Sequence, residues 1–276
     1  MVVQHNLTAM NSNRMLGLTT SSQAKSTEKL SSGYRVNRAA DDAAGLAISE
    51  KMRRQIKGLT QASRNAQDGI SCVQTAEGAL TEVHSMLQRM NELSIKAANG
   101  TNTKADREAV AQELSALVVE IDRVSTSTQF NTQNLLNGEF TGKKLQVGAA
   151  SGTAYEIDIH ISKMNASSIG IVANDIKVGD STGAAAKTLI AKVTKAIASV
   201  SKQRSALGAI QNRLEHTIDN LDNVVENTTS AESRIRDTDM ASEMVNYSKN
   251  NILAQAGQSM LAQANQSNQG VLSLLG

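Results

Sequence analysis

Residues 48–97 read ISEKMRRQIKGLTQASRNAQDGISCVQTAEGALTEVHSMLQRMNELSIKA. Apolar or small side chains recur in this stretch about every 3.5 residues, which is the repeat of a coiled-coil seam. The pattern predicts one helix of roughly 50 residues, ending at Asn99-Gly100, a common pair at a helix C-terminus. The seam positions are Ile48, Met52, Leu59, Ala62, Ala66, Val73, Ala76, Leu80, Val83, Leu87, Met90 and Ala97.

Two further long helices follow from the same kind of pattern. Thr103 and Asp106 have capping-box spacing, which predicts a helix start, and the apolar stripe after them runs to about Thr128. The short link predicts that this helix is antiparallel to the first. Asp180, Ser181 or Thr182 is expected to cap the third helix. The two stripes are Val110, Leu114, Leu117, Ile121 and Val124, then Val193, Ala196, Val200, Leu207, Ile210, Leu214, Leu221 and Val224.

Between residues 131 and 177 the helical period gives way to Gly, Asn and strict alternation. Alternating apolar and polar residues predict a half-buried strand, with residues 144–147 as its partner and 148–152 as the turn. We therefore expect a mainly α fold, a bundle of three long helices with one small β-hairpin near 141–178. The apolar positions of the strand are Tyr155, Ile157, Ile159 and Ile161.

Residues 1–53 and 233–276 share a helix-permissive composition rich in Ala, Ser, Gln and Asn and poor in large apolar side chains. Segments of this kind bury too little surface to fold well alone, so we expect them to pair and to pack against other copies of the chain. The positions expected in this weaker seam are Leu7, Met10, Leu16, Leu18, Ile252, Leu253, Met260, Leu261, Val271, Leu272, Leu274 and Leu275.

The composition narrows the class of protein. The 276 residues include no proline and only 2% aromatic residues, which suits long helices with a core of Leu, Ile, Val, Met and Ala. A net charge of +2 gives no field that favours nucleic acid. Cys72 is the only cysteine, and we expect it to be a buried small hydrophobe. Neither a cleaved signal peptide nor an apolar run of the roughly 18 residues that a membrane helix needs is expected.

The residues give no pattern typical of an enzyme. His5, His84, His160 and His216 are scattered without metal-ligand spacing, and Asp41-Asp42 read as a charged helix junction. The phosphate-binding, dinucleotide-binding and nucleophile-elbow motifs do not occur. We therefore predict a protein that is not an enzyme and that needs no cofactor and no metal.

Six motifs together carry a resemblance to a known family. They cover nearly the whole chain outside about 141–185 and stand in one order: LSSGYRVNRAADDAAGLAISEKMRRQIKGL (30–59), QDGISCVQTAEGAL (67–80), RMNELSIKAANGT (89–101), EIDRVSTSTQFNTQNLLNG (120–138), LGAIQNRLEHTIDNL (207–221) and NQSNQGVLSLLG (265–276). With these motifs the chain resembles the bacterial flagellins, and is similar to the short forms that keep only the two conserved inner domains.

The resemblance implies a structural subunit that polymerises into the flagellar filament for motility. Residues 1–44 and 233–276 would form the terminal coiled-coil domain, disordered in the monomer and ordered in the filament. Residues 45–232 would form the helical bundle domain with its hairpin. The chain would leave the cell through the flagellar export apparatus without a cleaved signal and reside in the extracellular flagellum. Its implied partners are other copies of itself, an export chaperone, and the cap and hook-junction proteins, with no nucleic acid and no membrane insertion.

The same resemblance implies recognition by host innate immunity. The host Toll-like flagellin receptor would contact Arg89, Leu93 and Glu113, and a cytosolic sensor would read Val271, Leu272, Leu274 and Leu275, which also serve subunit packing. Cys72 departs from the usual lack of cysteine in the family. Two alternatives remain open at this point: an adaptor at the junction of hook and filament, and a monomeric receptor ligand or adhesin.

Overall fold

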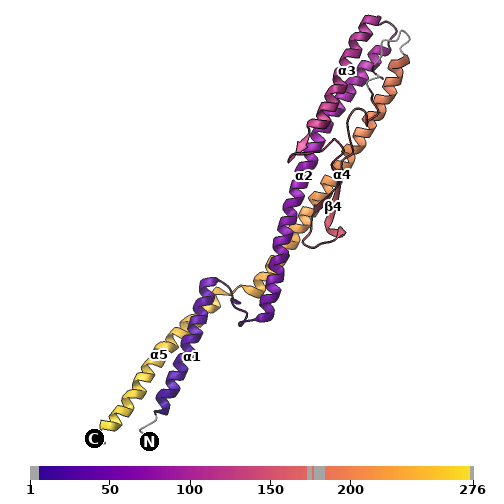
Figure 1. Ribbon diagram of the computed structural model, residues 1–276. Helices are drawn as coiled ribbons and strands as arrows, with labels where there is room; N and C mark the ends of the chain where they lie inside the picture. The colour runs from indigo at the N-terminus through magenta and orange to yellow at the C-terminus, as the bar shows by residue number, and fades with distance from the viewer. Residues whose placement is uncertain (1–5, 173–175, 177–183, 274–276) are drawn as a thin grey trace. The chain divides into compact units, whose positions relative to one another are not determined.

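The computed structural model describes residues 6–172, 176 and 184–273, and within them the fold is mainly α, as predicted (Figure 1). The residues proposed to cap the third long helix, Asp180, Ser181 and Thr182, lie outside this range. The helices are α1 (Leu7–Ser32), α2 (Ala43–Ala98), α3 (Lys104–Ser127), α4 (Ala184–Arg236) and α5 (Met240–Ser273). The strands are β1 (Gln129–Phe130), β2 (Gln133–Asn134), β3 (Thr141–Gln146) and β4 (Glu156–His160).

The chain divides into two compact units, and the boundaries between them fall within α2 and α4. One unit comprises residues 1–56 and 226–276 and holds α1 and α5. The other comprises residues 57–225 and holds α3, the strands and most of α2 and α4. We call them the terminal unit and the bundle unit, and describe each by itself.

The core of the bundle unit is built mainly from the predicted seams. Leu80 and Leu87 of α2, Leu114 of α3 and Leu207 of α4 are all fully buried, and so is Leu189 of α4, which precedes the predicted stripe. The capping box before α3 is also present, since the backbone N–H of Thr103 donates to Asp106 Oδ2 over 2.9 Å and Asp106 N–H returns a bond to Thr103 Oγ1. The heptad repeat of aliphatic residues is thus sufficient to place the three long helices around one core.

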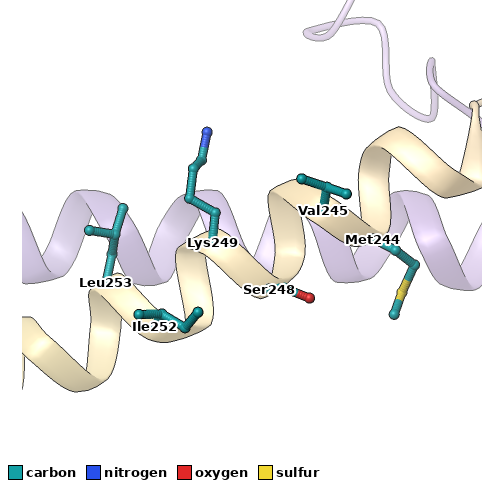
Figure 2. A pocket seen from close by; sticks show the side chains of 6 residues that line it. All are labelled: Met244, Val245, Ser248, Lys249, Ile252 and Leu253. Carbon is teal, nitrogen blue, oxygen red and sulfur yellow. The ribbon is translucent and has the colours of Figure 1, made fainter.

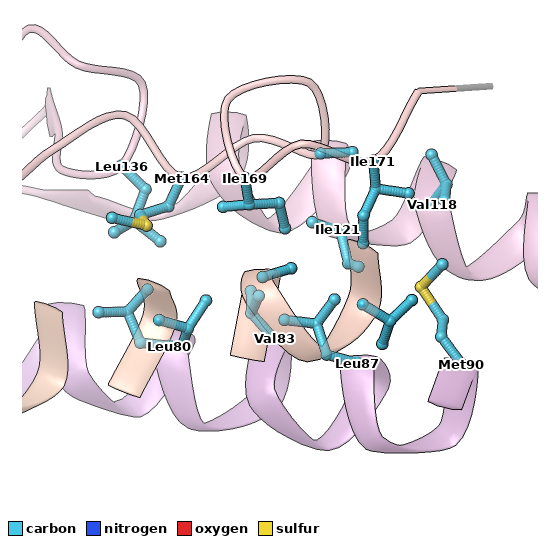
Figure 3. Packing of buried hydrophobic residues seen from close by; sticks show 14 of the residues in the cluster. Leu80, Val83, Leu87, Met90, Val118, Ile121, Leu136, Met164, Ile169 and Ile171 are labelled. Atoms are coloured by element: carbon cyan, nitrogen blue, oxygen red, sulfur yellow. The ribbon is translucent and has the colours of Figure 1, made fainter. Parts of the chain in front are cut away.

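The segment after β4 adds a layer to this core that the sequence did not predict. Figure 3 shows Met164, Ile169 and Ile171 lying over the α2 side chains around Leu80 and Leu87. All three are at most 6% exposed. Residues 161–172, the described stretch that follows β4, form no strand or α-helix, so the periodicity that revealed the other core positions is lacking there.

The predicted hairpin is β3 paired with β4, antiparallel, with Leu145 opposite Ile157. Ile157 and Ile159 are buried, but the prediction for Tyr155 was wrong. Tyr155 ends a single 3-10 turn, closed by its N–H donating to the Gly152 carbonyl over 3.0 Å, and its side chain is 45% exposed. Its ring fills the space beside Gly148, where a Cβ atom would overlap it.

The hairpin is fixed to the helices by polar and steric contacts. Asn65 Nδ2 of α2 donates to the carbonyl of Gln146 over 3.0 Å, and Gln203 Nε2 of α4 donates to the carbonyl of His160 over 2.9 Å. Gly69 of α2 allows Leu145 to approach so closely that a Cβ atom there would overlap the leucine Cδ1. These contacts hold both strands against the bundle.

A second, smaller hairpin joins β1 to β2 and was not predicted. Each strand has two residues, too few for an alternating pattern to be visible. The turn between them consists of Asn131 and Thr132, both with positive φ, 46° and 64°. This is an ordinary conformation for asparagine and an unfavourable one for a β-branched threonine.

Within the terminal unit, the predicted seam of α2 is wrong at Ile48, which is 46% exposed. The buried line on this part of α2 passes instead through Ser49, which is 1% exposed. Ser49 Oγ donates to Glu232 Oε1 of α4 over 2.7 Å. At this point of α2 the buried position is therefore Ser49, which makes a polar contact with α4, and not the apolar Ile48.

Candidate functional site: the outer face of the terminal helices

Helices α1 and α5 lie side by side and antiparallel in the terminal unit (Figure 1). Asn6 Nδ2 donates to the carbonyl of Ala264 over 3.0 Å near one end of the pair, and Gln23 Nε2 lies 3.5 Å from Asn251 Oδ1 further along. Asn6 also caps α1, because its Oδ1 accepts from the N–H of Ala9 over 2.9 Å. The two ends of the sequence thus pair with each other, as expected.

Small and polar side chains make this pairing. Ala9 and Ser26 of α1 and Ala254 of α5 are 9%, 5% and 6% exposed. A Cβ atom added at Gly257 would lie 3.4 Å from Leu16 Cδ1, an ordinary van der Waals distance, so Gly257 lies opposite Leu16 in the pair. Burial of a large aliphatic side chain contributes about 1.5–3 kcal/mol, and alanine and serine contribute much less. The pair is therefore held by little apolar burial of its own.

The large apolar side chains of both helices point away from the pairing surface. We call them the outer apolar face: Leu7, Met10, Met15 and Leu18 of α1 and Met244, Val245, Ile252, Leu253 and Met260 of α5, each 50–71% exposed. At 3.6 residues per turn, Leu7 and Leu18 lie on the side of α1 opposite Ala9 and Gln23, with Met10 and Met15 on the two flanks. Both helices therefore carry exposed large apolar side chains along their length.

This arrangement divides the expected seam positions into two groups. Leu16 and Leu261 are half-buried, and Leu16 lies against Gly257 in the pair. Leu7, Met10, Leu18, Ile252, Leu253 and Met260 are each at least 50% exposed, so of the two contacts expected of these segments they suit packing against other copies of the chain. Sequence reasoning missed Met15, Met244 and Val245, although the seven-residue spacing of Val245 and Ile252 is itself a helical stripe.

Part of the outer apolar face is a shallow groove on α5 of about 500 Å³ (Figure 2). Its lining is almost entirely aliphatic, with one hydroxyl and one ammonium group: Met244, Val245, Ser248, Lys249, Ile252 and Leu253. Exposed apolar surface of this kind marks a site of protein–protein contact. Val271 and Leu272, proposed above for the sensor and for packing, belong to α5 but their side chains, like all of Leu274 and Leu275, lie outside the described residues.

A compact junction fixes the other end of the α1–α5 pair. Gly33 ends α1 in a left-handed conformation, with φ of 75° and its N–H donating to the Lys29 carbonyl over 2.8 Å. Thr238 N–H donates to the carbonyl of Gly33 over 3.0 Å, next to the start of α5. Asp41, predicted to belong to a charged helix junction, accepts backbone N–H bonds here, and the one from Arg38 lowers its pKa.

The proposed receptor residues lie in the bundle unit. Arg89 of α2 forms two hydrogen bonds to Glu113 Oε1 of α3, from Nε over 3.0 Å and from Nη2 over 2.8 Å, and its Nη1 lies 3.3 Å from Glu92 Oε2. The Glu113 carboxylate raises the pKa of the Arg89 guanidinium. Both side chains are about half exposed, whereas Leu93 is 2% exposed and belongs to the core. The structure therefore brings Arg89 and Glu113 together at the surface and places Leu93 beneath it.

Cys72 is buried, as predicted, with 4% exposure. Burial raises the pKa of its thiol to about 11, so the group is neutral at physiological pH. It borders a depression of about 240 Å³ together with Phe130, Phe140 and Leu145. A protonated thiol in apolar surroundings is not a nucleophile.

The described part of the chain holds no cluster of three or more His, Cys, Asp or Glu side chains suited to a metal ion. Among the helices that the structure describes, none combines the length and the apolarity needed to span a bilayer. With metal binding and membrane spanning set aside for the described residues, the outer apolar face is their most prominent surface feature.

Comparison with known proteins identifies the family. The family model for the bacterial flagellin N-terminal helical region matches residues 3–141, and that for the C-terminal helical region matches residues 190–275. The chain is 55% identical to a flagellin of Halalkalibacterium halodurans over 275 residues, and 49% identical to a flagellin of Bacillus subtilis over 303 aligned positions. It is also 46% identical to the flagellar filament 31.3 kDa core protein of Treponema maltophilum. Each alignment covers 100% of both chains.

Solved structures agree with this result. The crystal structure of Bacillus cereus flagellin superposes with a TM-score of 0.50 at 28% identity, covering 57% of this chain and 88% of that one. A protein from Vibrio parahaemolyticus assigned as flagellar hook-associated gives a TM-score of 0.62 at 15% identity, which shows a shared fold alone. From the family models and the full-length identities, the chain belongs to the bacterial flagellin family.

Proposed function

We propose that this chain is the structural subunit of a bacterial flagellar filament and polymerises with other copies of itself through the outer apolar face. One observation carries the proposal: both terminal helices expose their large apolar side chains, among them Leu7, Leu18 and Ile252, on the side away from their mutual contact. Relatives named flagellin and flagellar filament core protein align over their full length. The role is structural rather than enzymatic, and its place is the extracellular flagellum.

The energetics are compatible with association. Full burial of an aliphatic side chain contributes about 1.5–3 kcal/mol, so burying the exposed half or more of the nine members of the outer apolar face together is comparable with the roughly 4–15 kcal/mol that association costs. Small residues such as Ala9, Ser26 and Ala254 give the α1–α5 pair little apolar burial. Association with other copies would bury the outer apolar face and so stabilise the pair. Residues 1–44 and 233–276 are therefore disordered in the monomer and order in the filament, around a bundle of residues 45–232 that folds alone.

Family membership extends the proposal to export and to accessory partners. The chain leaves the cell through the flagellar export apparatus without a cleaved signal, with an export chaperone beforehand and cap and hook-junction proteins at assembly. A terminal region that orders only on assembly supports this route, because the chain must travel unfolded. Amide hydrogen exchange tests the ordering: residues 7–32 and 240–273 exchange rapidly in the monomer and slowly in the filament. Equal protection in both states would contradict it.

The function itself is tested by seeded polymerisation. Purified protein is mixed with sheared filament fragments and examined by negative-stain electron microscopy, and long tubes are expected. Short caps or rings on the seeds, with no elongation, would instead support the adaptor at the junction of hook and filament. The shared fold of the Vibrio parahaemolyticus protein at 15% identity does not separate the two, so elongation decides.

A second role, as a ligand of the host Toll-like flagellin receptor, draws support from the Arg89–Glu113 pair. Two charge-assisted bonds hold both groups in fixed positions on the surface of α2 and α3, which suits them to specific recognition. In a receptor reporter assay, Arg89→Ala and Glu113→Ala should each reduce signalling at least tenfold. Arg123→Ala, which removes a similarly exposed pair with Glu120 on α3, is the matched control and should have no effect. An equal loss of signalling in all three variants would contradict a specific role for the Arg89–Glu113 pair.

Recognition of the C-terminal tail by a cytosolic sensor is proposed on family resemblance alone. It involves Val271, Leu272, Leu274 and Leu275. Replacing all four by alanine should abolish sensor activation while receptor signalling through Arg89 and Glu113 is retained. Undiminished sensor activation by the variant would contradict the assignment.

A further inference from the structure

The methionines that the structure shows exposed lie on the terminal helices. Of the nine described methionines, Met52 and Met86 are half-buried. Five others are 47–63% exposed and belong to α1 or α5: Met10, Met15, Met240, Met244 and Met260. In the bundle unit, by contrast, Met90 is fully buried and Met164 is 6% exposed. Four of the exposed five belong to the outer apolar face, and Met244 borders the groove on α5. Figure 2 shows its thioether projecting from the helix.

An exposed thioether is open to two-electron oxidation. The sulfur lone pair attacks one oxygen of hydrogen peroxide, the O–O bond breaks, and that oxygen is transferred to the sulfur. The sulfur is oxidised to methionine sulfoxide and the peroxide is reduced to water. The product is polar and accepts hydrogen bonds, whereas the side chains beside it, such as Ile252 and Leu253, are aliphatic.

We propose that peroxide oxidises the five exposed methionines of the unassembled subunit, and that the sulfoxides prevent polymerisation until they are reduced. This inference rests on the proposed function, because it assumes that the outer apolar face is buried between copies. Burial would leave the sulfoxide oxygens of the four methionines on the outer apolar face without hydrogen-bond partners in an apolar contact, which opposes association. The same burial protects the methionines once the filament has formed.

The first experiment maps the oxidation sites. Unassembled protein is treated with hydrogen peroxide, and the sulfoxide content of each methionine is read by peptide mass spectrometry. Met10, Met15, Met240, Met244 and Met260 should be oxidised at least tenfold faster than Met90 and Met164. In preformed filaments the four methionines of the outer apolar face should be protected to a similar extent. Oxidation at equal rates throughout, or in both states, would overturn the proposal.

The second experiment measures the consequence. Peroxide-treated protein should fail to elongate seeds, and treatment with methionine sulfoxide reductase and its reductant should restore elongation. A variant carrying M10L, M15L, M240L, M244L and M260L should elongate seeds both before and after peroxide. Fully oxidised wild-type protein that elongates normally would overturn the inference, as would a variant that peroxide still inhibits. Failure of the untreated wild-type protein to elongate would instead overturn the proposed function.

Reductase rescue of the wild-type protein keeps the proposal falsifiable if the fivefold variant assembles poorly. In that event M90L and M164L together provide a matched variant that removes buried methionines only. Its elongation should remain sensitive to peroxide, to the same extent as that of the wild-type protein. Resistance to peroxide in this variant would place the sensitive sites in the core and contradict the assignment.

Discussion

The guanidinium carbon of Arg236 lies 4.6 Å from the centroid of the Tyr34 ring, so two residues near opposite ends of the sequence stack at one point. Beside them the N–H of Arg35 donates to the carbonyl of Arg236 over 2.7 Å, and Tyr34 pairs with Asp237 in an isolated antiparallel bridge. The junction lies where α1 and α4 end. It therefore determines where the α1–α5 pair begins.

Removing the Tyr34 ring should weaken this junction and hence assembly. A cation–π contact at an exposed site contributes about 0.5–1 kcal/mol, so Tyr34→Ala should raise the critical concentration for polymerisation about two- to fivefold. Tyr34→Phe keeps the ring and should behave as the wild type. The comparison is made by sedimentation of filaments at a series of protein concentrations. Equal defects in both variants would assign the role of Tyr34 to its hydroxyl group.

Two glycines of α2 should respond oppositely to alanine. Gly78 has no atom within 4 Å of an added Cβ, so Gly78→Ala should stabilise the bundle unit by about 1 kcal/mol through helix propensity. At Gly69 the same change meets Leu145, and overpacking costs about 1–3 kcal/mol. Urea denaturation of the monomer gives both values. Stabilisation by Gly69→Ala would show that the hairpin does not pack against α2 in this way.

The turn between β1 and β2 should be improved by glycine at position 132. Thr132 has φ of 64°, and the left-handed conformation costs a residue with a Cβ atom about 1–2 kcal/mol. Thr132→Gly should therefore raise the free energy of unfolding by about 1 kcal/mol. Asn131→Gly in the same turn is the control, and should change it by only a few tenths, because asparagine tolerates this conformation. The free energy of unfolding of each variant is measured by circular dichroism in urea. If both substitutions lowered it, the turn between β1 and β2 would be of another type.

The start of α3 should give the bundle unit a pH dependence. The Thr103 hydroxyl and backbone N–H bonds lower the pKa of Asp106 below its ordinary value of 3.8. Because the folded-state pKa is the lower one, this stabilisation is complete above the unfolded-state value and is lost as pH falls through the folded-state value. The melting temperature of Asp106→Ala should be below that of the wild type at pH 7, and the difference should shrink below about pH 4. A constant difference down to pH 2 would exclude titration of Asp106 as the cause.

The bundle can be predicted well from the sequence because its buried residues recur at a regular helical spacing. Val73, Leu80 and Leu87 repeat at heptad spacing, and all three are buried. The capping box of α3 is likewise visible as two residue types at a fixed distance. Where no period exists the sequence gives little, as for Ile169 and Ile171 in the segment after β4, whose burial depends on contacts with distant helices.

In the candidate site, by contrast, a regular apolar pattern is present but does not reveal its partner. The sequence predicts that the terminal segments pair with each other and pack against other copies, but it does not say which large residue serves which contact. In the structure the pairing surface includes the buried Ala254 and the contact of Gly257 with Leu16. The apolar stripes on α1 and α5 are therefore present as predicted, but their large side chains are exposed in a single copy of the chain. A single sequence cannot distinguish a stripe that packs within the chain from one that packs against another copy.

The most direct test of assembly through the outer apolar face is the critical concentration of a variant carrying Val245→Ser and Ile252→Ser. These side chains are 68% and 66% exposed, so their loss should leave the monomer's unfolding in urea unchanged. Val119→Ser on α3, at 65% exposure, removes a comparable exposed side chain from the bundle unit and serves as the control. Seeded elongation followed by sedimentation should show a critical concentration at least tenfold higher for the double variant than for the control, because two side chains worth about 1.5–3 kcal/mol each are lost. Elongation at an unchanged critical concentration would contradict the account.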